Sequence, residues 1–239
     1  MEYINDNWRS VVVDEIRRAR RYDKEYGYEL YRDLSGYIYE LMGVMHFLEY
    51  LSSNSSKLRS RRVLDIGAGS CMATSQIRSS LRGRDLTVEA TVLRLCRGAE
   101  VNFGLKGLHV TSCEVLREIP DLSIAGIISV FGVAYSKVPI QAIFQINRVL
   151  VPSGVFKSVF YSERARIYDG LTPNIPDDFE SALKNHGYDV AVEKHERVGS
   201  KVLVAVKPPI LIPASELLSH DISDWSSQQN EAIKLFPPR

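Results

Sequence analysis

One short segment constrains the fold of this chain more than any other. Residues 62–66 form an apolar run, and Gly67 and Gly69 follow it directly before a segment with helical spacing. Glycines at such a junction allow positive φ angles and let a ligand approach the backbone, while a helix amino terminus supplies unpaired N–H groups. The segment therefore predicts a strand, a ligand-binding turn and a helix in succession.

Four further apolar runs rich in valine and isoleucine follow, and they alternate with segments that have a helical pattern. The expected strands lie at residues 62–66, 86–91, 108–111, 124–130 and 155–161. Strands that alternate with helices indicate a parallel sheet with helices on both faces. Two alternating runs, residues 188–195 and 201–206, predict an antiparallel hairpin at the carboxyl end. The predicted fold class is α/β, a doubly wound, mainly parallel seven-stranded sheet of the Rossmann-like type with an N-terminal helical cap.

The chain is expected to divide into three parts. Residues 1–56 carry apolar side chains at three- and four-residue steps and end in a serine-rich linker at residues 52–56, which predicts a helical cap. Residues 57–207 hold the alternating strands and helices of the main domain. Residues 208–239 begin with two prolines and are largely polar, which indicates a tail or a cover for a sheet edge.

Charge and cysteine content argue against several classes of partner. The chain has 30 lysines and arginines against 29 aspartates and glutamates, so no overall field favours nucleic acid. Residues 57–106 carry an excess of basic side chains, which leaves open a solvated helix face or an anion-binding surface. The three cysteines lack the spacing of a zinc site or a disulfide framework, which predicts no metal and a cytoplasmic location. No uncharged stretch reaches the ~20 apolar residues of a bilayer span, so no membrane association is expected.

The turn after the first strand does not match a dinucleotide fingerprint. Met72 stands where the third glycine of the Gly-x-Gly-x-x-Gly pattern is required. Asp65, two residues before Gly67, would repel a pyrophosphate and attract a positively charged ligand. NAD and FAD are therefore disfavoured, and the favoured ligand carries positive charge.

Residues 63–69 resemble the first motif of the class I S-adenosylmethionine-dependent methyltransferases. That motif reads hydrophobic-hydrophobic-Asp-hydrophobic-Gly-x-Gly-x-Gly, and Cys71 replaces its last glycine in this chain. The resemblance extends over residues 61–207 and includes residues 146–154, which look like the family's turn before the fifth strand. It implies that the chain binds S-adenosyl-L-methionine and transfers its methyl group.

The resemblance also implies which residues bind the cofactor. Glu89, expected at the end of the second strand, would hold the ribose hydroxyls, because a carboxylate accepts two hydroxyl donors; a surface glutamate is the alternative. Cys113 or Glu114, after the third strand, would lie at the adenine amino group. The complete set of expected cofactor-binding residues is Asp65, Gly67, Ala68, Gly69, Glu89, Ala90, Cys113, Glu114 and Val130.

The acceptor is expected beyond the fourth strand. The segment there lacks the Asn/Asp-Pro-Pro-Tyr pattern of enzymes that methylate base amines or protein amides, which counts against those substrates. Tyr135 is the candidate catalytic residue, with a tyrosine that only caps the core as the alternative. Tyrosines cluster in residues 20–50, which predicts an aromatic cap over the acceptor pocket or helices packed on the sheet edge. His46 is expected in the core.

Three functions remain open from the sequence. Methyl transfer to a small-molecule acceptor is favoured by the aromatic cap and the near-neutral charge. An RNA or protein methyltransferase that uses the basic surface of residues 57–106 is the second, and nucleic acid is the less favoured partner. A non-catalytic protein of this fold that binds S-adenosylmethionine is the third, because Cys71 replaces a glycine and the adenine contact is undefined.

Overall fold

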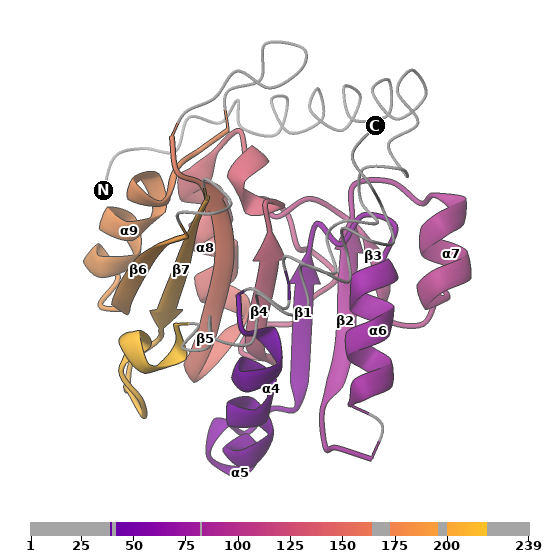
Figure 1. Ribbon diagram of the computed structural model, residues 1–239, viewed down its shortest axis with the longest axis horizontal. Coiled ribbons are helices and arrows are strands. Elements are labelled where there is room, and N and C mark those ends of the chain that lie inside the picture. The colour runs from indigo at the N-terminus through magenta and orange to yellow at the C-terminus, as the bar shows by residue number, and fades with distance from the viewer. Residues whose placement is uncertain (1–38, 40–41, 82, 164–172, 196–199, 219–239) are drawn as a thin grey trace, which may run out of the picture.

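A seven-stranded sheet forms the centre of the protein (Figure 1). The structure is a computed structural model and describes residues 39, 42–81, 83–163, 173–195 and 200–218. The strand order across the sheet is β3-β2-β1-β4-β5-β7-β6. The strands are β1 Arg62–Ile66, β2 Thr87–Val92, β3 Leu108–Val110, β4 Ile124–Val130, β5 Leu150–Tyr161, β6 Asp189–His195 and β7 Ser200–Val206.

The pairing of the strands confirms the predicted fold class. Strands β1 to β5 run parallel to one another, and helices connect β1 to β2, β2 to β3 and β4 to β5. Strand β7 runs antiparallel to both β5 and β6, which is the predicted hairpin at the carboxyl end. All carboxyl ends of the parallel strands therefore meet at one edge of the sheet.

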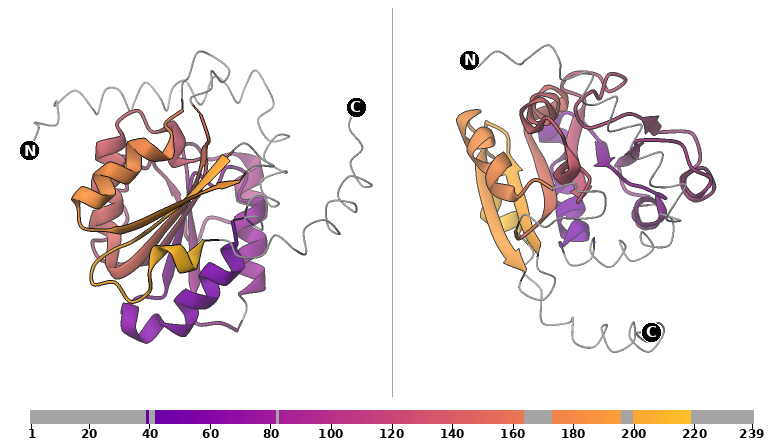
Figure 2. Two further views of the ribbon diagram at one scale, coloured as in Figure 1. Left: turned by 60° about the vertical axis from the view of Figure 1, so that its left-hand side comes forward. Right: turned by 90° about the horizontal axis from the view of Figure 1, so that it is seen from above.

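Helices cover both faces of this sheet (Figure 2). They are α4 Val44–Ser53, α5 Ser55–Leu58, α6 Met72–Ser80, α7 Arg97–Phe103, α8 Pro139–Val149 and α9 Pro176–Asn185, with short 3₁₀ helices η1 Val133–Tyr135 and η2 Ala214–Leu217. Successive strand residues point to opposite faces, so Ile127 and Ile128 of β4 enter different apolar clusters. Helices α4 and α6 pack into the cluster of Ile128, and α8 and α9 into that of Ile127.

Helix α4 lies on β4 at a position where the strand has no side chain. A Cβ atom added to Gly126 would lie 2.3 Å from Leu51 Cδ1 and 2.8 Å from Phe47 Cζ. Both of these side chains are fully buried. Glycine at this strand position therefore sets how closely α4 approaches the sheet.

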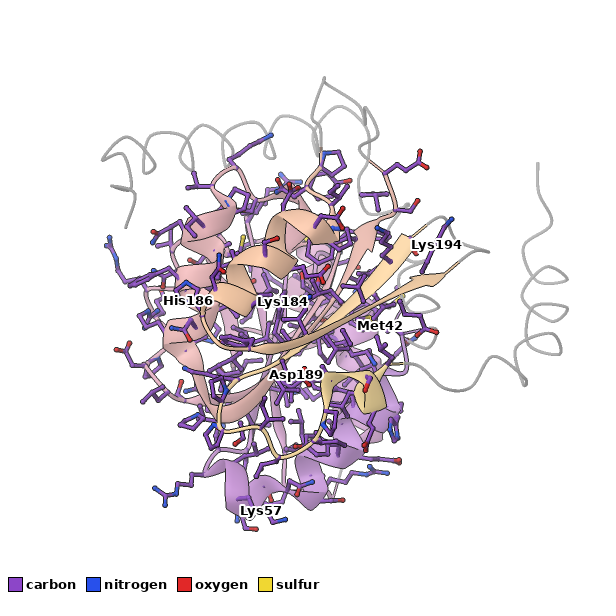
Figure 3. All side chains as sticks on the ribbon, turned by 90° about the vertical axis from the view of Figure 1, so that its left-hand side faces the viewer. Met42, Lys57, Lys184, His186, Asp189 and Lys194 are labelled. Atoms are coloured by element: carbon purple, nitrogen blue, oxygen red, sulfur yellow. The ribbon has the colours of Figure 1, made fainter. Side chains whose placement is uncertain are left out.

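Residues 208–218 pack against the hairpin strands (Figure 3). The Asp189 carboxylate at the start of β6 accepts a hydrogen bond from the Ala214 backbone N–H at 2.7 Å. Lys157, fully buried in β5, donates from Nζ to the Leu217 carbonyl oxygen at 2.6 Å. This part of the predicted tail thus covers the sheet, and residues 219–239 lie outside the described ranges.

Three local expectations from the sequence are wrong. The expected linker of residues 52–56 is helical, because α4 continues to Ser53 and α5 begins at Ser55. The second strand is expected over residues 86–91, but β2 continues to Val92, because Val92 still pairs with β3. His46 is exposed on α4 instead of buried, because the apolar stripe of that helix runs through other positions.

Candidate functional site

The turn after β1 and the loop after β4 are fixed against each other at the carboxyl edge of the sheet. Gly67 has a φ of +76°, and a Cβ atom there would lie 2.8 Å from the Cα of Gly132. A Cβ atom on Gly132 would lie 2.3 Å from the Ile66 carbonyl oxygen. Ser129 Oγ donates to that same oxygen at 2.9 Å and accepts from the Val133 N–H at 3.0 Å. Neither glycine position has room for a side chain.

Asp65 lies beneath this turn and is fully buried. The Tyr39 hydroxyl lies 2.9 Å from Oδ1 and 2.8 Å from Oδ2 of the carboxylate, and Thr74 Oγ1 also donates to Oδ2. Burial raises the pKa of the Asp65 carboxyl to about 6, while the hydrogen bonds from Thr74 and Tyr39 oppose this shift. Asp65 of β1 thus links Tyr39 to Thr74 near the start of α6.

Strand β2 supports the glycine-rich turn from the side. The Gly67 N–H donates to Thr91 Oγ1 at 3.1 Å, and the Ala68 N–H donates to the Thr91 carbonyl at 2.9 Å. Ala90 pairs with Asp65 in the parallel ladder and is fully buried. Gly69 continues the turn with a φ of +65°. Asp65, Gly67, Ala68, Gly69 and Ala90 are therefore brought together, as the sequence predicted.

Glu89 does not end its strand, so this part of the prediction is wrong. It lies three residues before Val92, and both of its carboxylate oxygens are engaged. Arg62 donates from Nε at 2.6 Å and from Nη2 at 2.9 Å, and His109 Nε2 lies 2.8 Å from Oε2. Burial disfavours the charged form, but the hydrogen bonds from His109 and Arg62 outweigh it and lower the pKa of Glu89 to about 2.

No carboxylate lies near the observed end of β2 at Val92, in residues 90–96. Residues 90–96 read Ala-Thr-Val-Leu-Arg-Leu-Cys. The Glu89 carboxylate instead links β2 to Arg62 of β1 and His109 of β3, and its hydrogen bond with His109 raises the pKa of that histidine. The described contacts of Glu89 thus join three strands of the sheet.

Cys113 and Glu114 lie in the loop after β3, and both are buried. Glu114 Oε1 accepts from Ser136 Oγ at 2.8 Å and from the Lys137 N–H at 2.9 Å, while the Cys113 thiol lies 3.2 Å from Oε2. Glu114 therefore ties this loop to the segment after η1. The neighbouring Ser112 Oγ is buried and has no hydrogen-bond partner among the described residues. Only the folded structure shows this orphaned hydroxyl.

Three aromatic rings gather at the carboxyl ends of β4 and β5, directly after Val130. Phe131, with a left-handed φ of 57°, stacks on Tyr161 with ring centroids 4.5 Å apart. Tyr135 meets the Tyr161 ring edge-on at 6.2 Å, and the two hydroxyl oxygens are 2.8 Å apart. The sequence pattern indicates Tyr135 but gives no signal for Tyr161, which lies beside Tyr135 because β4 pairs with β5.

The aromatic cap predicted for residues 20–50 is described only in part, because residues up to 38 and residues 40–41 lie outside the described ranges. Tyr39 contacts Asp65 as given above. Tyr50 packs on the core, and its hydroxyl is buried without a partner among the described residues. Within the described ranges, His, Cys, Asp and Glu side chains form no group of three or more that could hold a metal ion. None of the helices there has the length and apolar character of a bilayer span.

The chain matches no family model and no curated protein, whereas its fold matches many solved structures. A S-adenosylmethionine-dependent methyltransferase from Archaeoglobus fulgidus matches with a TM-score of 0.54 and 13% identity, over 74% of this chain and 94% of that one. The DszA carbon methyltransferase matches with a TM-score of 0.54 and 16% identity, over 74% and 58% of the two chains. The CurJ carbon methyltransferase matches with a TM-score of 0.51 and 17% identity, over 62% of this chain and 48% of that one. The chain thus spans about half the length of these two carbon methyltransferases, and it has the class I methyltransferase fold.

Proposed function

We propose that the chain binds S-adenosylmethionine at the carboxyl edge of β1 and transfers its methyl group to a small-molecule acceptor. The observation that carries this proposal is the glycine-rich turn over buried Asp65, in the class I methyltransferase fold. Ligands of open α/β sheets bind outside the carboxyl ends of the strands. When bound, the cofactor supplies an electrophilic methyl group on a positively charged sulfur.

The residues at this edge fit the cofactor in most respects. Gly67, Ala68 and Gly69 present backbone without side chains larger than a methyl group, which suits a ligand that lies close to the turn. The orphaned Ser112 hydroxyl is a buried group that a polar ligand atom can satisfy. Glu89, by contrast, is committed to Arg62 and His109, and we therefore assign it no part in binding the ribose.

The acceptor is proposed to lie on the aromatic rings beside this turn. Phe131 directly precedes Gly132, which packs on Gly67, so the rings and the proposed cofactor turn are adjacent. Aromatic side chains exclude water and stack on planar molecules. Methyl transfer needs the acceptor atom and the sulfonium to be held in line, and positioning alone supplies a large part of such catalysis. The paired hydroxyls of Tyr135 and Tyr161 can orient a polar group of the acceptor or exchange a proton with it.

Tyr135→Phe tests the role of the aromatic site. The variant keeps the ring and its contact with Tyr161 but removes the hydroxyl, so methyl transfer should fall about tenfold or more, with cofactor affinity unchanged. The assay follows label from methyl-labelled S-adenosylmethionine into a fractionated cell extract. Transfer into RNA or protein fractions alone would contradict the small-molecule acceptor.

Tyr188→Phe is the matched control for this experiment. Tyr188 is buried, whereas Tyr135 is partly exposed, and like Tyr135 it has a hydrogen-bonded hydroxyl, which donates to Asn147 Oδ1 at 3.0 Å. It directly precedes β6, whose first residue pairs with Val206 of β7, and Val206 in turn pairs with Val155 of β5. Tyr188 therefore lies away from the carboxyl edge of the parallel strands, where Tyr135 lies. Its loss should leave transfer unchanged. If both variants transfer methyl groups as fast as wild type, the Tyr135 hydroxyl has no role in transfer and Tyr135 serves only in packing.

A second candidate function is binding of the cofactor without methyl transfer. Both oxygens of Glu89 are engaged within the sheet, and residues 90–96 contain no carboxylate. A bound ribose would then lack a charged acceptor, the sulfonium would be oriented less firmly, and in-line transfer would suffer more than binding. Cofactor affinity together with a complete lack of transfer into every extract fraction would support this second function over the first.

A further inference from the structure

The carbonyl oxygen of Gly69 accepts weak hydrogen bonds from two thiols. Cys71 Sγ lies 3.8 Å from this oxygen, and Cys96 Sγ lies 3.9 Å from it. Cys71 is the residue before α6, at the end of the glycine-rich turn, and Cys96 is the N-cap residue of α7 (Figure 1). Because both sulfur atoms lie within 4 Å of one oxygen atom, they are less than about 8 Å apart although the two residues are distant in sequence.

The two thiols share an apolar cluster but differ in exposure. Cys71 packs with Ala99 and Phe103 and is fully buried, and Cys96 packs against the same cluster while remaining partly exposed. Cys96 is therefore the more accessible of the two thiols to a small oxidant from solvent. This is the arrangement of an attacking thiol and a resolving thiol.

We propose that Cys71 and Cys96 form an oxidation site that closes to an intramolecular disulfide when the chain meets a hydroperoxide. The Cys96 thiolate attacks the O–O bond of hydrogen peroxide, an S–O bond forms, and hydroxide leaves and takes up a proton. The Cys71 thiol then attacks the sulfur of the Cys96 sulfenic acid, the S–S bond forms, and water leaves. Two thiols thereby lose two electrons and two protons, and one peroxide becomes two waters.

Cys113 provides an internal control within the same chain. It lies in a different apolar cluster, beside Leu116, and its thiol contacts Glu114 Oε2 at 3.2 Å. Burial, together with the nearby negative charge of Glu114, raises the pKa of the Cys113 thiol well above its usual range. Since the thiolate is the reactive form, Cys113 stays reduced under conditions that oxidise the pair.

The disulfide would connect two segments that the fold holds side by side. One is the turn that follows β1, and the other is the start of α7, which follows β2. Closing the bond also withdraws both thiols from the Gly69 carbonyl, so the turn would exchange two weak hydrogen bonds for one covalent link. The formation of this bond does not depend on the proposed function.

The test is peptide mapping of the full-length chain after oxidation. The reduced protein is treated with hydrogen peroxide, remaining thiols are blocked with iodoacetamide, and the protein is digested with trypsin. We expect residues 63–78 to appear linked to residues 95–97, and residues 107–117 to carry the alkyl group on Cys113. The intact mass should fall by two hydrogens before alkylation, and dithiothreitol should restore it.

Two single variants complete the experiment. Cys113→Ser should still form the linked peptide, and Cys96→Ser should form no intramolecular disulfide, while serine retains an N-cap group for α7. A peroxide-treated protein in which Cys96 carries sulfenic or sulfinic acid and Cys71 is alkylated would overturn the proposal. So would a disulfide that includes Cys113, or one that forms only between two chains.

Discussion

At the residue scale, three ionisable side chains are buried, and each has a different set of partners. Glu89 is held by Arg62 and His109, which lower its pKa to about 2 although burial opposes this shift. Among the described residues, the donors to the Asp65 carboxylate are hydroxyl groups, and burial raises its pKa to about 6. Burial lowers the pKa of Lys157 to about 7, and Glu193 offsets this only in part. These pKa shifts make the free energy of unfolding depend on pH.

Glu89→Gln should lower the free energy of unfolding at pH 7 by roughly 2–3 kcal/mol, because it removes the charge that pairs with Arg62 and His109. Between pH 4.5 and 2 the unfolded Glu89 binds a proton that the folded one does not, so wild type loses this advantage as the pH falls through that window. Urea titrations at several pH values measure it.

The same variant tests whether Glu89 contacts the cofactor. Because both of its oxygens are engaged within the sheet, affinity for S-adenosylhomocysteine should be the same in Glu89→Gln as in wild type. A folded variant with a tenfold or greater loss of affinity, about 1.4 kcal/mol, would show that Glu89 binds the ribose of the cofactor.

Lys157→Met should change the pH dependence of stability above neutral pH. Between pH 7 and 10.5 the unfolded lysine holds a proton that the folded one lacks, so wild type gains about 1 kcal/mol of unfolding free energy per pH unit from this group. The methionine variant lacks this gain. The exposed Lys184→Met is the control and should behave as wild type. Parallel stability curves for Lys157→Met and wild type between pH 7 and 9 would show that Lys157 is charged in the folded chain.

At the scale of elements, the register between neighbouring strands explains which sequence predictions hold. The apolar runs and the glycine-rich turn report local structure, and they predicted the sheet and the residues grouped around Asp65. The expectation that Glu89 ends its strand comes from the family resemblance, which places a ribose-binding carboxylate at the end of the second strand. Its partners come from β1 and β3, and no local pattern indicates that Arg62 and His109 lie beside it. Tyr161 was missed for the same reason, since its contact with Tyr135 depends on β4 lying next to β5.

Gly126→Ala should destabilise the packing of α4 on β4. The added methyl group would overlap the buried ends of Leu51 and Phe47, and overpacking of this kind costs roughly 1–3 kcal/mol. The double variant Gly126→Ala with Leu51→Ala makes room for the methyl group, so its loss should be smaller than the sum of the two single losses. Additive losses in urea titrations would mean that the helix moves freely away from the strand.

At the scale of the whole molecule, the fold brings five distant segments to one edge of the sheet. The turn after β1, the end of β2, the loop after β3 and the aromatic rings after β4 and β5 come from separate parts of the chain. Their contacts with one another, through Thr91, Gly132 and Glu114, hold this edge in a defined shape. The proposed cofactor and acceptor sites share this edge. The proposed disulfide between Cys71 and Cys96 would join the turn after β1 to the start of α7.

Calorimetric titration with S-adenosylhomocysteine tests the proposed cofactor site most directly. Wild type should bind it, and Gly67→Ala should lose binding, because its methyl group would meet the Gly132 backbone. Gly83→Ala is the matched control, since Gly83 also has a positive φ but nothing lies within 4 Å of an added Cβ atom, and its affinity should equal that of wild type. No heat of binding with wild type, or equal affinity in a folded Gly67→Ala variant, would contradict a cofactor site at the turn after β1.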